Sequence, residues 1–85
     1  MDNYVFPAIF EPSEDVGYCV SFPDLPGCLT QGDTISESIY MAIDVLELHL
    51  SGLKEDNDEI PYPSPFNVIQ APTNSHVLPI RVKIK

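Results

Sequence analysis

The alternation of apolar and polar positions predicts three β-strands in the first third of the chain. Residues 4–11 are rich in β-branched and aromatic side chains, and both faces of this strand are apolar, so we expect both faces to be covered. Pro7 has no N–H and should therefore face an unpaired side or a bulge. Residues 17–22 predict a second strand, antiparallel to the first, and residues 28–31 predict a short third strand.

The spacing of apolar residues then changes to that of a helix. Thr34 and Glu37 form a capping-box pattern, in which Glu37 reaches back to the N–H of the N-cap residue. The helix should run to about Leu50, with Gly52 as its C-cap. Its core stripe follows the i, i+3, i+4, i+7 rule and consists of Ile35, Ile39, Ala42, Ile43, Leu46 and Leu50. A second apolar stripe beside it consists of Met41, Val45 and Leu48.

The rest of the chain predicts an irregular connection and a final strand. Residues 60–72 contain repeated prolines and should form extended irregular chain. Residues 76–85 predict a strand with one solvated face, because Ile80, Val82 and Ile84 alternate with Arg81, Lys83 and Lys85. The predicted order is β-β-β-α-β, an α+β fold with one helix packed on a face of an antiparallel sheet. We expect residues 1–85 to form a single domain.

Charge and composition limit the kinds of partner that this chain can bind. Thirteen Asp and Glu against four Lys and Arg give a net charge of −9, which repels nucleic acid and anionic membranes and attracts basic proteins. No apolar run is long enough to span a membrane and the start is no signal peptide, so we expect a cytoplasmic protein. Cys19 and Cys28 are expected to be reduced thiols in the core.

Motifs for catalysis are missing from the sequence. There is no glycine-rich phosphate loop and no GxSxG elbow, and we expect no enzyme activity, no cofactor and no metal site. Asp24, Asp33, Glu37 and Asp44 could in principle cluster to hold the two Mg²⁺ ions of a metal-dependent nuclease. Such a nuclease requires carboxylates inside strands, whereas these acids fall in predicted loops or on the helix. A nuclease is therefore a remote alternative.

Turn-forming residues at fixed spacing carry a family resemblance. The segments are Phe6-Pro7-Ala8-Ile9-Phe10, then Phe22-Pro23-Asp24-Leu25-Pro26-Gly27-Cys28, then Thr30-Gln31-Gly32-Asp33-Thr34. Through them, residues 4 to about 65 resemble the HicB-type antitoxins of bacterial type II toxin–antitoxin pairs. The resemblance implies a degraded RNase H-like fold without the nuclease acids. It also implies a partner, a small basic HicA-type toxin that cleaves mRNA and whose active site the antitoxin covers.

The resemblance and the charge together suggest the contact residues. We expect Asp24 and Leu25 in the proline-locked loop, and Asp33 and Glu37 at the helix start, to contact the toxin. Alternatively, the loop only fixes the fold and the acids only keep the protein soluble. An orphan interaction module of the same fold without a toxin is a further alternative.

Two more expectations concern assembly and DNA. The stripe of Met41, Val45 and Leu48 should form an interface between copies, giving a homodimer or a tetramer. Many HicB-type antitoxins continue into a domain that binds operator DNA. We expect no such C-terminal domain here, and no direct binding of nucleic acid.

Overall fold

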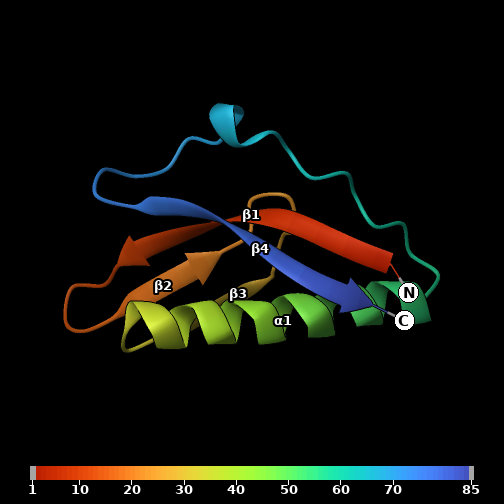
Figure 1. Cartoon of the computed structure of the whole chain (residues 1–85), viewed down its shortest axis with the longest axis horizontal. Helices are drawn as coiled ribbons and strands as arrows, with labels where there is room; N and C mark the ends of the chain where they lie inside the picture. Colours follow the sequence, from red (N-terminus) through yellow and green to blue (C-terminus); the bar gives the residue numbers. More distant parts are fainter. Residues whose placement is uncertain (1, 85) are drawn as a thin grey trace.

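The computed structural model describes residues 2–84 as one antiparallel sheet with one long helix. The elements are β1 (Asp2–Pro12), β2 (Tyr18–Ser21), β3 (Leu29–Gly32), α1 (Ile35–Glu55), the 3-10 helix η1 (Phe66–Val68) and β4 (His76–Ile84). The strand order is β3-β2-β1-β4, so β3 and β4 form the two edges. In Figure 1 the sheet lies between α1 and the proline-rich connection. The predicted order β-β-β-α-β and the α+β class are confirmed; Lys85 lies outside the described residues.

The register explains how the sheet accommodates proline. Ile9 to Pro12 pair with β2, whereas Asp2 to Phe10 pair with β4. Pairing with β2 stops at Ile9, so Pro7 faces an unpaired side there, as predicted. On the other side Pro7 lies opposite Pro79, and neither residue has an N–H to donate. This position can therefore only be a non-hydrogen-bonded pair of the antiparallel ladder.

Helix α1 begins as predicted but ends later. The Thr34 hydroxyl accepts a hydrogen bond from the Glu37 N–H at 3.0 Å. The predicted C-cap at Gly52 is wrong, because the helix continues to Glu55. Asn57, at φ 58°, takes the left-handed conformation that ends the helix, and the N–H of Asp58 donates to the carbonyl of Leu53 at 2.8 Å. This is the Schellman pattern, in which asparagine replaces the usual glycine.

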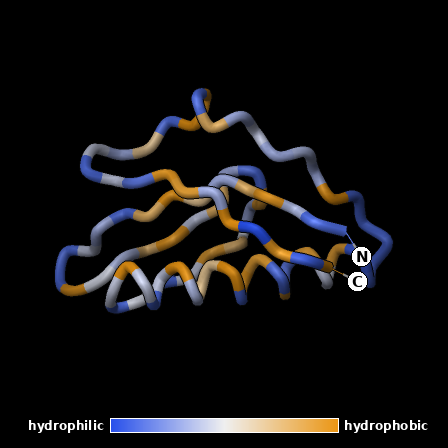
Figure 2. The backbone as a smooth tube through the Cα atoms, viewed as in Figure 1, coloured by the Kyte–Doolittle hydropathy of each residue, from blue (hydrophilic) through white to orange (hydrophobic). Residues whose placement is uncertain are grey.

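The core forms between α1 and the near face of the sheet. Figure 2 shows apolar positions of α1 recurring on the side turned towards the strands. Ala42, Leu46 and Leu50 are fully buried, as predicted, but Ile35 and Ile43 are 37% and 39% exposed. The buried stripe also includes a residue that the pattern missed, Ser38.

Ser38 turns inward because its polar group is satisfied locally. Its hydroxyl donates to the carbonyl of Thr34 at 2.7 Å, so burial leaves no unpaired donor. Gly32, at the end of β3, lies directly against Ser38 and has no side chain to keep the two backbones apart. The start of α1 can therefore pack closely on β3, which turns Ile35 and Ile43 towards solvent.

Candidate partner-binding surface

The loop between β2 and β3 is a tight, internally bonded turn. The Leu25 N–H donates to the Phe22 carbonyl, and the Cys28 N–H donates to the Leu25 carbonyl, each at 3.0 Å. Gly27 has φ 85°, a conformation that suits glycine and strains other residues. Leu25 points into the core and is 1% exposed. The predicted contact of Leu25 with a partner is therefore wrong, and its side chain instead anchors the loop.

Asp24, in the same loop, is held by the proline-rich connection. Its carboxylate accepts hydrogen bonds from both the backbone N–H of Ser64, at 2.8 Å, and the Ser64 hydroxyl. The two residues are 40 positions apart, and both are half-buried. Asp24 therefore joins the loop to the residue between Pro63 and Pro65. Sequence reasoning missed this contact, and a serine isolated between two prolines was the only signal for it.

Asp33 and Glu37 lie on the surface at the start of α1. Glu37 does not reach the N-cap residue as predicted: its Oε1 accepts from the N–H of Asp33, one residue earlier, at 2.7 Å. Both side chains are exposed. The β2–β3 hairpin pairs Tyr18 with Gly32 at this end and Ser21 with Leu29 at the other, beside the Asp24 loop. The structure thus places Asp24 and the Asp33–Glu37 pair at opposite ends of the hairpin.

The second stripe of α1 is less uniform than the sequence pattern indicated. Val45 already packs against the core, so it does not lack a partner. Met41 is half-buried, and only Leu48 of the three is fully on the surface, 73% exposed. Tyr40, which the pattern did not single out, is 72% exposed on the same helix. A role of Met41, Val45 and Leu48 in self-association stays a prediction.

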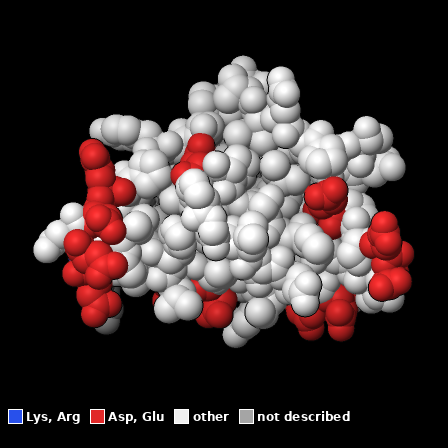
Figure 3. Space-filling model, turned by 180° about the vertical axis from the view of Figure 1, so that it is seen from behind, with Lys and Arg blue, Asp and Glu red and all other residues white. Residues whose placement is uncertain are grey.

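Acidic side chains dominate the surface. Figure 3 shows most of them towards the two ends and the lower edge of one face, with one group nearer the centre and no Lys or Arg in view among the described residues. Glu55, Asp56, Asp58 and Glu59, around the C-terminal end of α1, are all exposed. The exposed basic residues Arg81 and Lys83 lie on the edge strand β4. The field of the protein is therefore acidic over most of its surface.

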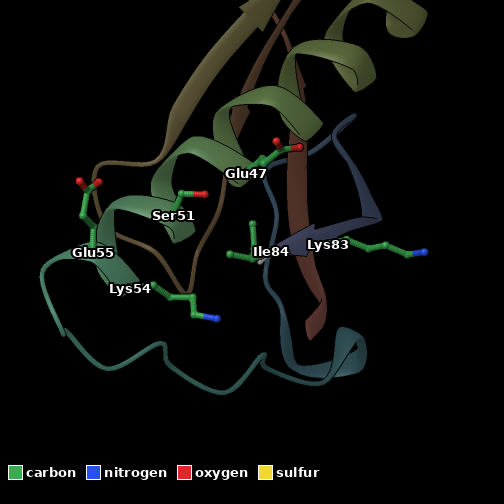
Figure 4. A pocket seen from close by; sticks show the side chains of 6 residues that line it. All are labelled: Glu47, Ser51, Lys54, Glu55, Lys83 and Ile84. Carbon is green, nitrogen blue, oxygen red and sulfur yellow. The ribbon is translucent and has the colours of Figure 1, made fainter. Parts of the chain in front are cut away.

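The surface formed by residues 2–84 includes two clefts. One, of about 580 Å³, lies where the C-terminal half of α1 meets the end of β4 (Figure 4), and its lining residues are Glu47, Ser51, Lys54, Glu55, Lys83 and Ile84. Lys54 there pairs with the Asp2 carboxylate at 3.4 Å, an exposed pair of the kind that contributes little to stability. The other, of about 460 Å³, lies over β2 and β3. Its lining includes Glu11 and Cys19, which lie opposite each other on β1 and β2.

The cysteines differ from each other. Cys28 is in the core, as predicted, whereas Cys19 is exposed on β2, so the prediction for Cys19 is wrong. Both are free thiols. Burial raises the pKa of the Cys28 thiol to about 11, which keeps it protonated and unreactive at neutral pH. Cys19 is the accessible thiol because the alternation along β2 turns Val20 inward and its neighbours outward.

Residues 2–84 form neither a metal-binding cluster nor a membrane-spanning helix. This part of the chain contains no group of three or more His, Cys, Asp or Glu residues placed to hold a metal ion. None of its helices is long and apolar enough to cross a membrane. Within the strands, Asp2 and Glu11 are exposed and lie at the ends of β1.

Comparison with known proteins identifies the family. A family model described as a HicB-like antitoxin of a bacterial toxin–antitoxin system matches residues 6–85. The chain belongs to the HicB-like antitoxin family. Antitoxin HicB 1 of Photorhabdus laumondii is 49% identical over 63 residues, which are 74% of this chain and 41% of the relative. Antitoxin HicB of Escherichia coli is 44% identical over 62 residues, 73% of this chain and 45% of the relative.

Solved structures of the HicB-like family have the same fold. A toxin–antitoxin complex from Streptococcus pneumoniae matches with a TM-score of 0.86 and 25% identity, over 96% of this chain and 70% of that chain. The N-terminal domain of the Burkholderia pseudomallei antitoxin HicB matches with a TM-score of 0.77 and 21% identity, over 95% and 100% of the two chains. The chain spans less than half the length of the two curated HicB relatives above.

Proposed function

We propose that this chain is an antitoxin module that neutralises a small basic HicA-type toxin by covering the active site with which the toxin cleaves mRNA. Family membership carries this proposal, together with the solved toxin–antitoxin complex among the similar structures. In this proposal the chain is a binding protein without catalytic activity. It acts in the cytoplasm, where mRNA is found.

The charge of the chain supports a basic partner. A ribonuclease must bind a phosphate backbone, so its active surface carries Lys and Arg. An acidic protein can occupy such a surface by placing carboxylates where phosphates would lie. The net charge of −9 and the exposed acids around both ends of α1 supply these carboxylates. Charge complementarity of this kind mainly raises the association rate, and added salt should lower that rate.

Asp33 and Glu37 are the proposed charged contacts at the start of α1. The hydrogen bond between them and the cap on Thr34 order this turn before any partner binds, so less entropy is lost on binding. Asp24, at the other end of the β2–β3 hairpin, is a further proposed part of the toxin-binding surface. The Asp24 carboxylate already accepts a hydrogen bond from Ser64, so Asp24 contributes to binding through the position of the segment that contains Ser64.

Co-expression with a small basic protein encoded beside this chain, where its genome carries one, tests the function. If the neighbour stops growth and degrades mRNA, this chain should restore growth and co-purify with it. Asp33→Lys should then slow association at low salt. Asp44→Lys, an exposed site further along α1, makes the same change in net charge and should slow it less. A toxic neighbour that forms no complex with this chain would contradict the proposal.

The alternative functions predict different outcomes. An orphan interaction module would co-purify with a protein that is not toxic. A metal-dependent nuclease would cleave RNA on addition of Mg²⁺, and cleavage would stop in an Asp24→Asn variant. We propose that neither occurs, and that the chain gives no sequence-dependent gel shift with operator DNA at physiological salt. Self-association into a homodimer or tetramer, with Leu48 at the interface, is part of the proposal.

A further inference from the structure

The proline-rich segment, residues 60–75, exposes several large apolar side chains. Tyr62 is 94% exposed, Phe66 is 40% exposed and Val68 is 58% exposed. The segment contains no Asp, Glu, Lys or Arg, although 20% of the chain is charged. Single exposed apolar residues are common on protein surfaces. Two aromatic residues and a valine within seven positions of an uncharged segment are the composition found at the centres of protein interfaces.

The segment is held in place before any partner arrives. Pro61, Pro63 and Pro65 restrict the backbone, and Pro65 has the extended angles φ −62° and ψ 143°. Ser64, between the last two prolines, donates both its N–H and its hydroxyl to the Asp24 carboxylate. Because the segment is already ordered, its aromatic side chains can be buried by a partner with little loss of backbone entropy.

The surroundings of the segment favour a basic partner over a second copy of this chain. Exposed acids at 55, 56, 58 and 59 directly precede it, around the end of α1. A second copy would bring like charges together there, whereas a basic protein would pair with them. Its Lys or Arg side chains can also lie over the face of Tyr62 as a cation–π contact. An apolar segment that begins next to a group of exposed acids therefore fits a protein whose contact surface is basic and partly apolar.

We infer that Tyr62, Phe66 and Val68 form the apolar centre of the toxin-binding surface, and that Asp24 acts as a positioning residue that holds this segment through Ser64. This inference rests on the proposed function, since the basic partner is the toxin. It assigns Asp24 a role through Ser64 instead of a direct ionic contact with the partner.

The affinity of the full chain for a catalytically inactive form of the neighbouring toxin tests the apolar centre. Tyr62→Ala should raise the Kd at least tenfold, mainly through faster dissociation, because aromatic anchors contribute most at such centres. Tyr40→Ala is the matched control, because Tyr40 is also largely exposed but lies on α1. It should change the Kd less than threefold.

Two substitutions of Asp24 separate positioning from charge. Asp24→Ala removes both acceptors and should raise the Kd at least fivefold, with faster hydrogen exchange at the Ser64 amide. Asp24→Asn keeps an acceptor for the Ser64 N–H and an amide that can donate to the Ser64 hydroxyl, so the Kd should stay within threefold of wild type. Circular dichroism verifies that both variants are folded. If Asn weakens binding as much as Ala, the charge itself contacts the toxin and the positioning role is wrong.

The outcomes also distinguish this inference from the proposed function. If the wild-type chain does not bind the toxin, the proposed function fails. If the wild-type chain binds and Tyr62→Ala binds equally well, the function stands and the apolar centre lies elsewhere. Loss of a homo-oligomer in Tyr62→Ala, with unchanged affinity for the toxin, would overturn the inference and place a second copy on this segment.

Discussion

Replacing Gly32 by alanine tests the close packing that positions α1 on the sheet. A Cβ added to Gly32 would lie 2.7 Å from the backbone N of Ser38, 2.7 Å from its Oγ and 2.8 Å from its Cα. Real Cβ atoms essentially never approach other heavy atoms within 3.0 Å. Two of the three atoms are backbone atoms of the helix, so rotating a side chain cannot relieve the contact. The end of β3 and the start of α1 must therefore move apart.

The loss of stability caused by this movement can be estimated from the effect of adding atoms to well-packed protein cores. Inserting a methyl group into a well-packed core costs about 1–3 kcal/mol. The lower entropy of the unfolded alanine variant offsets about 0.4–1 kcal/mol of this cost. We expect Gly32→Ala to lower the free energy of unfolding by about 1–2 kcal/mol. With an m-value on the order of 1 kcal/mol/M, the urea midpoint measured by far-UV circular dichroism should fall by about 1–2 M.

Gly52→Ala is the matched control, because this glycine lies inside α1 with nothing within 4 Å of an added Cβ. Alanine has the higher helix propensity, so the same substitution should here raise the free energy of unfolding by about 0.5–1 kcal/mol. The two substitutions should therefore change the free energy of unfolding in opposite directions. A Gly32→Ala protein as stable as wild type would show that β3 and α1 are not in the close contact described.

Four further predictions concern the cysteines, the helix cap and self-association. A thiol reagent should label Cys19 but not Cys28 in the native protein, and both after unfolding; equal native labelling would contradict the burial of Cys28. Burial raises the pKa of Cys28 to about 11. As the pH rises, its thiol therefore loses its proton at a lower pH in the unfolded state than in the folded state. Wild type should therefore lose stability relative to Cys28→Ala as the pH rises from about 9 to 11, by at most about 2–3 kcal/mol in urea titrations. Thr34→Ala removes the acceptor for the Glu37 N–H and should lower the free energy of unfolding by about 1 kcal/mol, whereas Thr34→Ser should leave it nearly unchanged. Leu48→Glu should shift sedimentation of a homo-oligomer towards monomer, and an unchanged profile would exclude Leu48 from the interface.

Most of the fold could be predicted because local patterns and the final packing agree. The alternation along β4 and the N-cap at Thr34 form as predicted, although Glu37 accepts from the N–H of Asp33 and not from that of Thr34. The end of α1 was mispredicted because a glycine without a positive φ is tolerated inside a helix. Asn57, which does adopt a positive φ, is a less obvious terminator.

The partner-binding surface was harder to predict because it depends on contacts between distant residues. Asp24 was selected for its charge in a rigid loop, but its hydrogen bonds to Ser64 join positions that no local pattern connects. Leu25 was expected on the surface because it lies in a turn, yet it points into the core. The exposure of Tyr62 depends on the path of the proline-rich segment. The prolines give this segment no regular structure, so its path is set by tertiary contacts that the sequence pattern does not show.

Titration of the neighbouring toxin with the purified chain tests the central claim most directly. A fixed amount of active toxin is incubated with mRNA, and cleavage is measured as the amount of this chain is increased. The account predicts that cleavage falls as the chain is added and stops once all of the toxin is bound, with the same end point for Tyr40→Ala. Undiminished cleavage at a large excess of folded chain would contradict the claim that this protein neutralises the toxin.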